Sequence, residues 1–204
     1  MPLRLPSVLS TLALSVALSA CSSTPNATEP TGEVAATTTT TAATSSAPKL
    51  DPSKDPAMNV VGKQAPEFTL DSIDGEQVSL SDFHGKNVVI LDFWETTCDP
   101  CLKEMPHLVK LYEKYKDRGL VVLAVSLDGP EELSHVNSVV HDKGMDVFHV
   151  LLDPQTSVYA KYTPKNDRPY TVVIGKNGAI ADEHGSYVPG DEKKLEELIA
   201  KLLP

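Results

Sequence analysis

Two cysteines lie three positions apart in the stretch Phe93–Pro106, which reads FWETTCDPCLKEMP. Cys98 and Cys101 follow a run of apolar residues and precede a segment with helical spacing. A C-x-x-C pair can act as a redox-active dithiol, can supply half of a zinc site, or can form a static disulfide. The neighbouring residues and the rest of the chain must discriminate among these three kinds of site.

The predicted start of a helix near Cys98 favours an ionised first thiol. The first backbone N–H groups of a helix have no intrahelical partner, and the helix dipole there stabilises an anion. Pro100 suits this first turn, because its missing N–H costs no hydrogen bond. Helix N-termini and nearby cations can lower a thiol pKa from about 8.5 to roughly 3.5–7.5. We therefore expect Cys98 to attack and Cys101 to resolve the mixed disulfide.

A metal site and a static disulfide are the competing interpretations of the cysteine pair. Zinc needs four ligands, and the chain has no second C-x-x-C pair. A disulfide across so short a loop constrains little of the unfolded chain. The redox pair is the favoured interpretation, and we expect neither a metal nor a cofactor. A metal site would have to recruit histidines that follow no metal-ligand repeat: His84, His107, His135, His141, His149 and His184.

The first residues, MPLRLPSVLSTLALSVALSAC, have the pattern of a secretory signal. Arg4 precedes an apolar stretch, and small residues precede Cys21. The ending LSAC resembles a bacterial lipobox, so we predict a lipoprotein-type signal peptide over residues 1–20 and lipidation of Cys21. An ordinary signal peptide with an incidental Cys21 is the alternative. Acyl chains would anchor the protein at a membrane surface.

Composition divides the rest of the chain into a tether and one domain. Residues 21–58 consist largely of Thr, Ala, Ser and Pro, which bury too little apolar surface to offset the entropy of ordering. Residues 59–204 have the length of a single domain. The net charge is −10 and no basic stripe occurs, which makes nucleic acid a poor candidate partner. With Cys21 assigned to lipid, the remaining two thiols form a pair.

Hydrophobic periodicity predicts the order β-β-β-α-β-α-β-α-β-β-α for the domain. Asp74-Gly75 and Lys176-Asn177-Gly178 are hairpin turn signals. Apolar runs predict buried strands at 87–94, 120–127 and 170–175. Strands that alternate with helices indicate an α/β fold with a mixed central sheet flanked by helices. The first helix is predicted from near Cys98 to the residues before Gly119, and the second, marked by Leu133, Val136 and Val140, from after Pro130 to Gly144. A short helix is predicted within 154–162, and the last helix has apolar residues on one face over 195–202.

The surroundings of the cysteines resemble the thioredoxin superfamily, and within it the membrane-anchored TlpA/ResA-like thiol–disulfide oxidoreductases. The resemblance covers nearly all of residues 60–203 and implies a thioredoxin-like fold with an N-terminal β-hairpin and a central helix–strand insert. Four segments carry it: residues 61–94, similar to the hairpin and first core strand shared with peroxiredoxins; CDPCLKEMP, similar to the catalytic helix; RPYTVVIGKNGAI, similar to the segment with the cis-proline; and residues 130–152, similar to the insert.

Four residues take roles from this resemblance. Pro169 corresponds to the cis-proline, and Trp94 to the aromatic residue that flanks the active site, where we expect it to serve the core and the rim together. Asp92 corresponds to the buried proton acceptor for Cys101, and Glu104 to an acidic residue beside the thiols. Asp92 could instead only bond neighbouring backbone, and Glu104 could be a solvated charge, but a carboxylate within VVILDFW is costly unless it is used or well bonded.

The chain also departs from the family pattern. Thr97 stands where most relatives have an aromatic residue, Arg168 precedes the proline, and Tyr170 replaces a common threonine. These changes bear on partner choice and redox potential. We expect the substrate to be bound by Pro169, Trp94, Arg168 and Pro100.

Charges near the sulfurs predict a reductant. Arg168 would stabilise a thiolate and make the disulfide more oxidising, whereas Asp92, Asp99 and Glu104 act in the opposite sense. The expected function is reduction of disulfides in exported proteins, with apocytochrome c as one candidate by analogy. A membrane thiol donor would restore the dithiol. We expect the protein at the outer face of a bacterial membrane, on the periplasmic or cell-surface side.

Two other functions remain alternatives. The shared N-terminal segment suggests a thiol peroxidase, but the P-x-x-x-T-x-x-C loop of that family needs a proline, and none occurs from Val88 to Asp99. Two thiols with a histidine could also bind Cu(I) as a chaperone does. Those chaperones usually space their cysteines one residue wider.

Overall fold

The computed structural model describes residues 61–163 and 165–203. The predicted signal peptide of residues 1–20, the lipidation site Cys21 and the tether of residues 21–58 lie outside the described residues, so these three predictions stay predictions. Among the described helices, none combines the length and the apolar character that crossing a bilayer requires.

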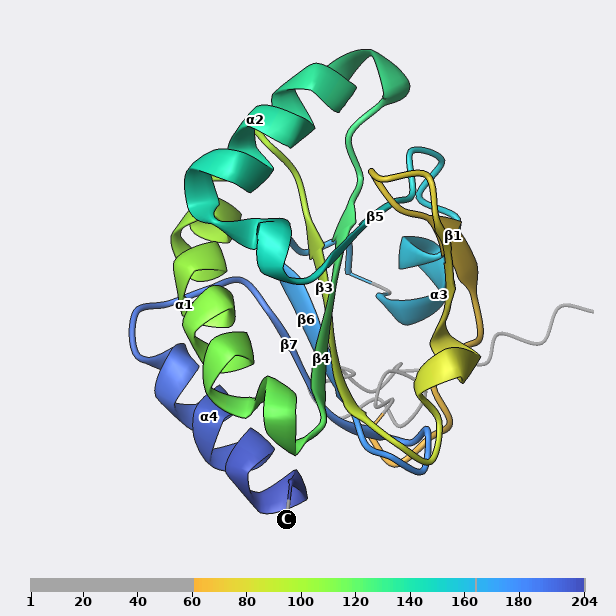
Figure 1. Ribbon diagram of the computed structural model, residues 1–204, viewed down its shortest axis with the longest axis vertical. Helices are drawn as coiled ribbons and strands as arrows, with labels where there is room; N and C mark the ends of the chain where they lie inside the picture. The colour runs from red at the N-terminus through yellow and green to blue at the C-terminus, as the bar shows by residue number, and fades with distance from the viewer. Residues whose placement is uncertain (1–60, 164, 204) are drawn as a thin grey trace, which may run out of the picture. The chain divides into compact units, whose positions relative to one another are not determined.

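The order of strands and helices is the predicted one, with short 3₁₀ turns between some of them (Figure 1). The main difference is the third helix, which begins only at Tyr159 because a hydrogen-bonded turn occupies the residues before it. The elements are β1 (Thr69–Asp71), β2 (Gln77–Ser79), β3 (Val88–Trp94), α1 (Asp99–Tyr115), β4 (Leu120–Ser126), α2 (Leu133–Lys143), β5 (His149–Leu152), α3 (Tyr159–Tyr162), β6 (Tyr170–Ile174), β7 (Ile180–Gly185) and α4 (Asp191–Leu202).

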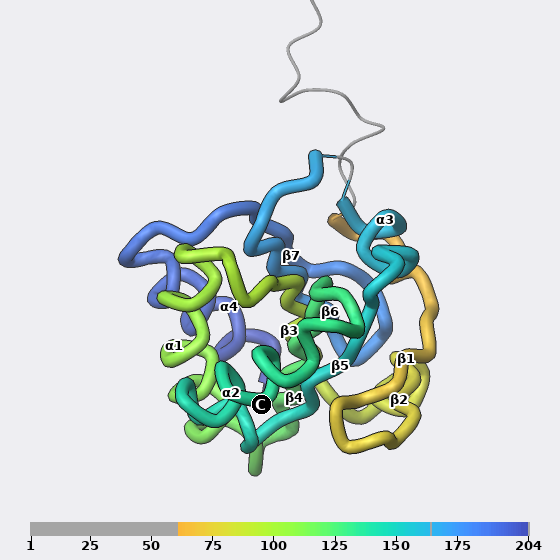
Figure 2. Tube along the Cα trace, turned by 90° about the horizontal axis from the view of Figure 1, so that it is seen from above, coloured from red at the N-terminus to blue at the C-terminus, as the bar shows by residue number. Residues whose placement is uncertain are grey.

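A five-stranded sheet in the order β5-β4-β3-β6-β7 forms the centre of the domain. The pairs β3–β4 and β4–β5 are parallel, whereas β3–β6 and β6–β7 are antiparallel. Strands β1 and β2 form a separate antiparallel hairpin. Helices α1, α2 and α4 cover one face of the sheet, and α3 with the hairpin covers the other (Figures 1 and 2). The predicted α/β, thioredoxin-like architecture is therefore confirmed.

Strand β3 lies at the middle of the sheet and is buried at all seven positions. Successive side chains of a strand point to opposite faces. Leu91 and Phe93 pack under α3 and the hairpin, whereas Ile90 and Trp94 join the core beneath α1. Asp92 stands between Ile90 and Trp94, so the alternation aims its carboxyl group at α1 as well.

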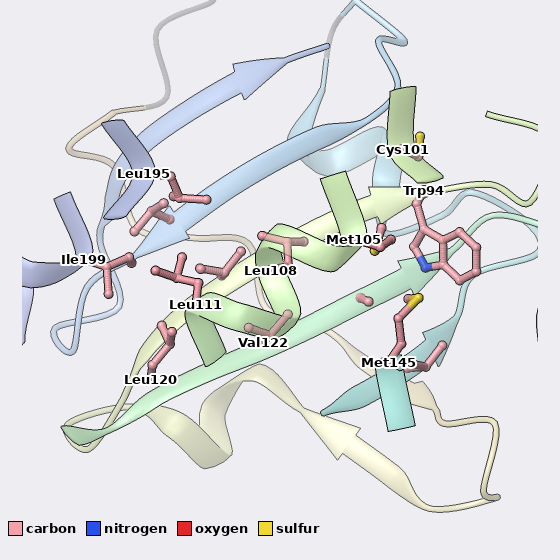
Figure 3. Packing of buried hydrophobic residues seen from close by; sticks show 14 of the residues in the cluster. Trp94, Cys101, Met105, Leu108, Leu111, Leu120, Val122, Met145, Leu195 and Ile199 are labelled. Carbon is pink, nitrogen blue, oxygen red and sulfur yellow. The ribbon is translucent and has the colours of Figure 1, made fainter. Parts of the chain in front are cut away.

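The helices on the α1 face contribute a single apolar core (Figure 3). Helix α1 buries Met105 and Leu108 against the sheet. On α2 all three marker residues lie within the helix as predicted: Leu133 begins it and is exposed, whereas Val136 and Val140 are buried together with Val139.

A buried carboxylate, Asp153, organises the turn that leads into α3. Its Oδ1 accepts hydrogen bonds from the backbone N–H and the hydroxyl of Ser157, at 2.9 and 3.0 Å. Its Oδ2 accepts from the N–H groups of Val158 and Tyr159, both at 2.9 Å. The Tyr159 hydroxyl in turn donates to the carbonyl of Asp167 at 2.7 Å. This chain of bonds holds the loop that precedes Pro169.

We expect Asp153→Ala to lower the free energy of unfolding by about 2–4 kcal/mol, because three backbone donors lose their acceptor. Urea unfolding followed by circular dichroism measures the change. Asp142→Ala, at an exposed position of α2, is the matched control and should change stability by less than about 0.5 kcal/mol. Equal effects of the two substitutions would show that the turn does not depend on Asp153.

Candidate active site

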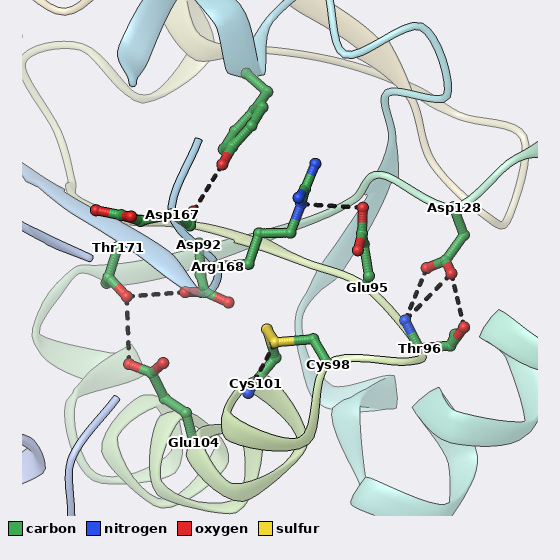
Figure 4. Close-up of a disulfide and its surroundings, with 11 residues drawn as sticks. Asp92, Glu95, Thr96, Cys98, Cys101, Glu104, Asp128, Asp167, Arg168 and Thr171 are labelled. Carbon is green, nitrogen blue, oxygen red and sulfur yellow. Dashed lines mark hydrogen bonds and ion pairs between the residues drawn. A yellow bond between two sulfur atoms is a disulfide. The ribbon is translucent and has the colours of Figure 1, made fainter. Parts of the chain in front are cut away.

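The two cysteines form a disulfide at the N-terminus of α1, with their Cα atoms 5.3 Å apart (Figure 4). Cys98 is the N-cap residue, and its Sγ accepts a hydrogen bond from the backbone N–H of Cys101 at 3.2 Å. Cys98 is partly exposed, whereas Cys101 has no exposed surface. An external thiol or disulfide can therefore reach Cys98 but not Cys101, as the sequence predicted.

The loop between β3 and Cys98 is tied to the end of the neighbouring parallel strand. Thr96 donates from its hydroxyl to Asp128 Oδ1 at 2.6 Å and from its N–H to Asp128 Oδ2 at 3.0 Å. Ser126 also donates to Asp128, at 2.8 Å. Sequence reasoning missed Asp128, although a carboxylate directly after strand β4 is placed at the same edge of the sheet as the end of β3.

Two buried carboxyl groups and one hydroxyl lie on the Cys101 side of the disulfide (Figure 4). Thr171 Oγ1 is 2.8 Å from Asp92 Oδ1 and 3.2 Å from Glu104 Oε1. A hydroxyl has a single proton and can donate to only one carboxylate at a time. The other carboxyl group must itself be protonated to bond the same oxygen. The position of the Thr171 hydroxyl between them thus favours one proton on this pair of carboxyl groups.

Burial raises the pKa of Asp92 well above its ordinary value, and the charge of Glu104 adds to that shift, while the hydrogen bond from Thr171 opposes it. A carboxyl group shifted toward the pKa of a thiol can exchange a proton with it at little cost. The structure therefore brings Asp92 and Glu104 together beside the disulfide, and their roles toward Cys101 stay predictions (Figure 4).

A histidine that sequence reasoning did not select completes this cluster. His184 Nε2 lies 3.8 Å from Glu104 Oε1. The interaction with the nearby Glu104 carboxyl group raises the pKa of His184, although partial burial opposes it. Its place at the site follows from strand register, because Thr171 of β6 pairs with Asp92 of β3 on one side and with His184 of β7 on the other.

The second loop at the site contains Arg168 and Pro169, joined by the cis peptide bond that the resemblance implied. Arg168 Nε lies 3.0 Å from Glu95 Oε1, and the guanidinium carbon is 5.3 Å from the centre of the Tyr159 ring. The ion pair connects the loop before Cys98 to the loop before Pro169. Glu95, which sequence reasoning missed, therefore offsets the charge that we expected Arg168 to direct at the sulfurs.

The expected position of Trp94 at the rim of the site needs correction. Its side chain is fully buried in the α1 core near Met105 and Met145 (Figure 3), so it offers no surface to a substrate. Its place on the α1 face of β3 accounts for this burial. Thr97 and Pro100 are exposed instead and form the surface beside Cys98. Among the described residues, no group of three or more His, Cys, Asp or Glu could hold a metal ion.

Comparison with known proteins gives a consistent picture. Residues 61–183 match the AhpC/TSA family. The chain is 35% identical over 146 residues to the thiol–disulfide oxidoreductase ResA of Bacillus thuringiensis subsp. konkukian, covering 71% of this chain and 79% of that protein. It is 34% identical over 143 residues to ResA of Halalkalibacterium halodurans, covering 70% and 77%.

Solved structures agree with these relatives. A Chlorobium tepidum protein, described as a candidate thiol:disulfide interchange protein DsbE, has a TM-score of 0.65 and 32% identity, covering 71% of this chain and 98% of that one. The thioredoxin domain of a thiol–disulfide oxidoreductase from Bacteroides vulgatus has a TM-score of 0.59 and 28% identity, covering 71% and 98%.

We expect Asp92→Asn to stabilise the oxidised protein at neutral pH, because the ionised carboxylate is disfavoured by burial. The folded-state pKa of Asp92 lies above its unfolded value, so the wild type binds more protons when folded, and its stability falls as pH rises between the two values. The advantage of the variant should therefore grow from about pH 4 upward. Urea midpoints across that range measure it.

The control for this experiment is Asp142→Asn, which removes an exposed carboxylate and should leave the pH dependence unchanged. An Asp92→Asn protein that is less stable than the wild type at pH 8 would contradict the assignment of a disfavoured buried charge.

Proposed function

Because the chain belongs to the AhpC/TSA family and, within the thioredoxin superfamily, to the ResA-like thiol–disulfide oxidoreductases, we propose that it reduces disulfides of exported proteins through Cys98 and Cys101. Thiol–disulfide oxidoreduction follows from the family; the direction of electron flow and the class of substrate are the proposal. The observation that carries it is the placement of one accessible and one buried sulfur beside two buried carboxyl groups.

In the proposed cycle the Cys98 thiolate attacks one sulfur of a substrate disulfide. A bond forms between Cys98 and that sulfur, and the other substrate sulfur leaves as a thiolate that takes a proton from water. Cys101 then loses its proton to a carboxylate and attacks Cys98 Sγ. The bond to the substrate breaks, the substrate is released as a dithiol, and the protein disulfide is formed again.

The charges at the site support the reducing direction. Asp92 and Glu104 both disfavour a nearby thiolate when they are ionised. Arg168 would favour one, but its ion pair with Glu95 reduces that effect. A reduced form that gains little thiolate stabilisation gives up its electrons more readily. The N-terminus of α1 acts in the opposite sense and keeps Cys98 reactive.

The predicted signal peptide, lipidated Cys21 and tether support a location outside the cytoplasm, anchored to the outer face of a bacterial membrane. In that oxidising compartment a membrane thiol donor must return electrons to the protein. Substrates would be exported proteins with disulfides, including apocytochrome c as a candidate. The surface formed by Thr97, Pro100 and Arg168 would meet them, while Pro169 is buried directly behind Arg168 and would shape this surface from below.

Trapping tests the function directly. In a Cys101→Ser protein, Cys98 should remain joined to its substrates, and mass spectrometry of the mixed disulfides identifies them. Cys98→Ser is the matched control and should trap none, because the remaining thiol is buried. Both variants should lose insulin reduction to the background rate.

The same purified wild type should be assayed for peroxide consumption and for Cu(I) binding. A peroxide turnover faster than insulin reduction would support the peroxidase instead, and a tight stoichiometric Cu(I) complex without disulfide reduction would support the chaperone.

A further inference from the structure

Three polar side chains lie in one row across the central sheet. Register pairs Asp92 of β3 with Thr171 of β6, and Thr171 with His184 of β7. Residues directly opposite each other in paired strands project from the same face of a sheet. Glu104 comes from α1 above that face and lies within 3.2 Å of Thr171 and 3.8 Å of His184.

The row leads from the core to the surface. Asp92 is completely buried and Glu104 is 3% exposed, whereas the side chain of His184 is 27% exposed. A hollow of about 190 Å³ between β7 and α4 is lined by Asp182, His184 and Asp191, among others. A second hollow of similar size lies between α1 and α4, and Glu104 is part of its wall. His184 is thus the member of this row with exposed surface, and it lies beside the buried Glu104 carboxyl group.

The cluster needs a cation if any of its carboxyl groups is ionised. One oxygen of each, Asp92 Oδ2 and Glu104 Oε2, has no hydrogen-bond partner among the described residues. His184 is the titratable base in direct range of Glu104. Charged groups that face His184 are Glu104 from α1, Asp182 on its own strand, and Asp191 with Lys194 from α4. Acidic groups outnumber Lys194 there, so an imidazolium is favoured.

We propose that His184 is a positioning residue for the thiol chemistry, whose imidazolium keeps Glu104 ionised while Asp92 holds the shared proton. This inference rests on the proposed function. In the resolving step the Cys101 S–H would give its proton to Glu104, and the Cys101 sulfur would attack Cys98 as the bond from Cys98 to the substrate breaks. The departing substrate thiolate takes a proton from water, and Glu104 returns its proton to solvent on the His184 side.

Reaction of the reduced full chain with 5,5′-dithiobis(2-nitrobenzoate) separates the two thiol steps in a stopped-flow experiment. The first thionitrobenzoate is released when Cys98 attacks, and the second when Cys101 resolves the mixed disulfide. We expect His184→Gln to slow the second phase about tenfold at neutral pH and to move its pH midpoint up by about one unit, since one unit is a tenfold change in ionisation. The first phase should change less than about twofold.

Two further variants test whether the positive charge of His184 is the cause of the expected change in the second phase. His184→Lys keeps a cation near Glu104 and should return the midpoint of the second phase toward the wild-type value. His141→Gln is the matched control: this histidine is exposed on α2, and its replacement should change neither phase.

Each remaining outcome has a definite meaning. If the second phase of His184→Gln has the wild-type pH profile, the role of His184 is refuted while the proposed function stands. If both phases slow equally, the midpoint stays in place and His184→Lys restores nothing, His184 is only a structural residue and the inference fails. If the wild type itself shows no second phase, the proposed function fails first.

Discussion

The burial of a carboxyl group in the central strand is the constraint on which the rest of the site depends. Asp92 is enclosed between Ile90 and Trp94 on the α1 face of β3, where an isolated charge would be very costly. The fold meets this cost with the hydroxyl of Thr171 and with a raised pKa, which favours the protonated form of Asp92. In the proposed cycle the buried Cys101 thiol would lose its proton to a carboxylate of this kind.

The geometry around the sulfurs separates their roles. Cys98 is the N-cap of helix α1, so the first sulfur is partly exposed at the positive end of the helix, and the second is turned into the core one turn later. The loop between β3 and Cys98 is held at two points, by hydrogen bonds from Thr96 to Asp128 and by the ion pair of Glu95 with Arg168. These contacts fix the loop before Cys98, while the Cys98 sulfur stays accessible.

Much of this could be predicted from the sequence, because the decisive signals were local. Apolar runs and turn residues marked the elements in order, and Asp92 and Glu104 are close along the chain to the cysteine pair. Glu95, Thr171 and His184 were not assigned to the redox site from the sequence, because their contacts arise from loop packing and from strand register between distant segments. Burial of Trp94 likewise depends on which face of β3 packs against α1, which local patterns alone do not decide.

The reduction potential of the cysteine pair and the protonation of the groups beside it therefore depend on the same charges. Raising the pH ionises Asp92 and removes the positive charge of His184, and both changes place more negative potential beside the thiols. A thiolate in the reduced protein is then stabilised less. The charges of the carboxyl cluster therefore favour the disulfide over the dithiol more strongly as the pH rises. The ion pair between Glu95 and Arg168 contributes little to this pH dependence, because an arginine stays protonated throughout. The pH dependence of the site thus depends on the row of side chains from Asp92 to His184.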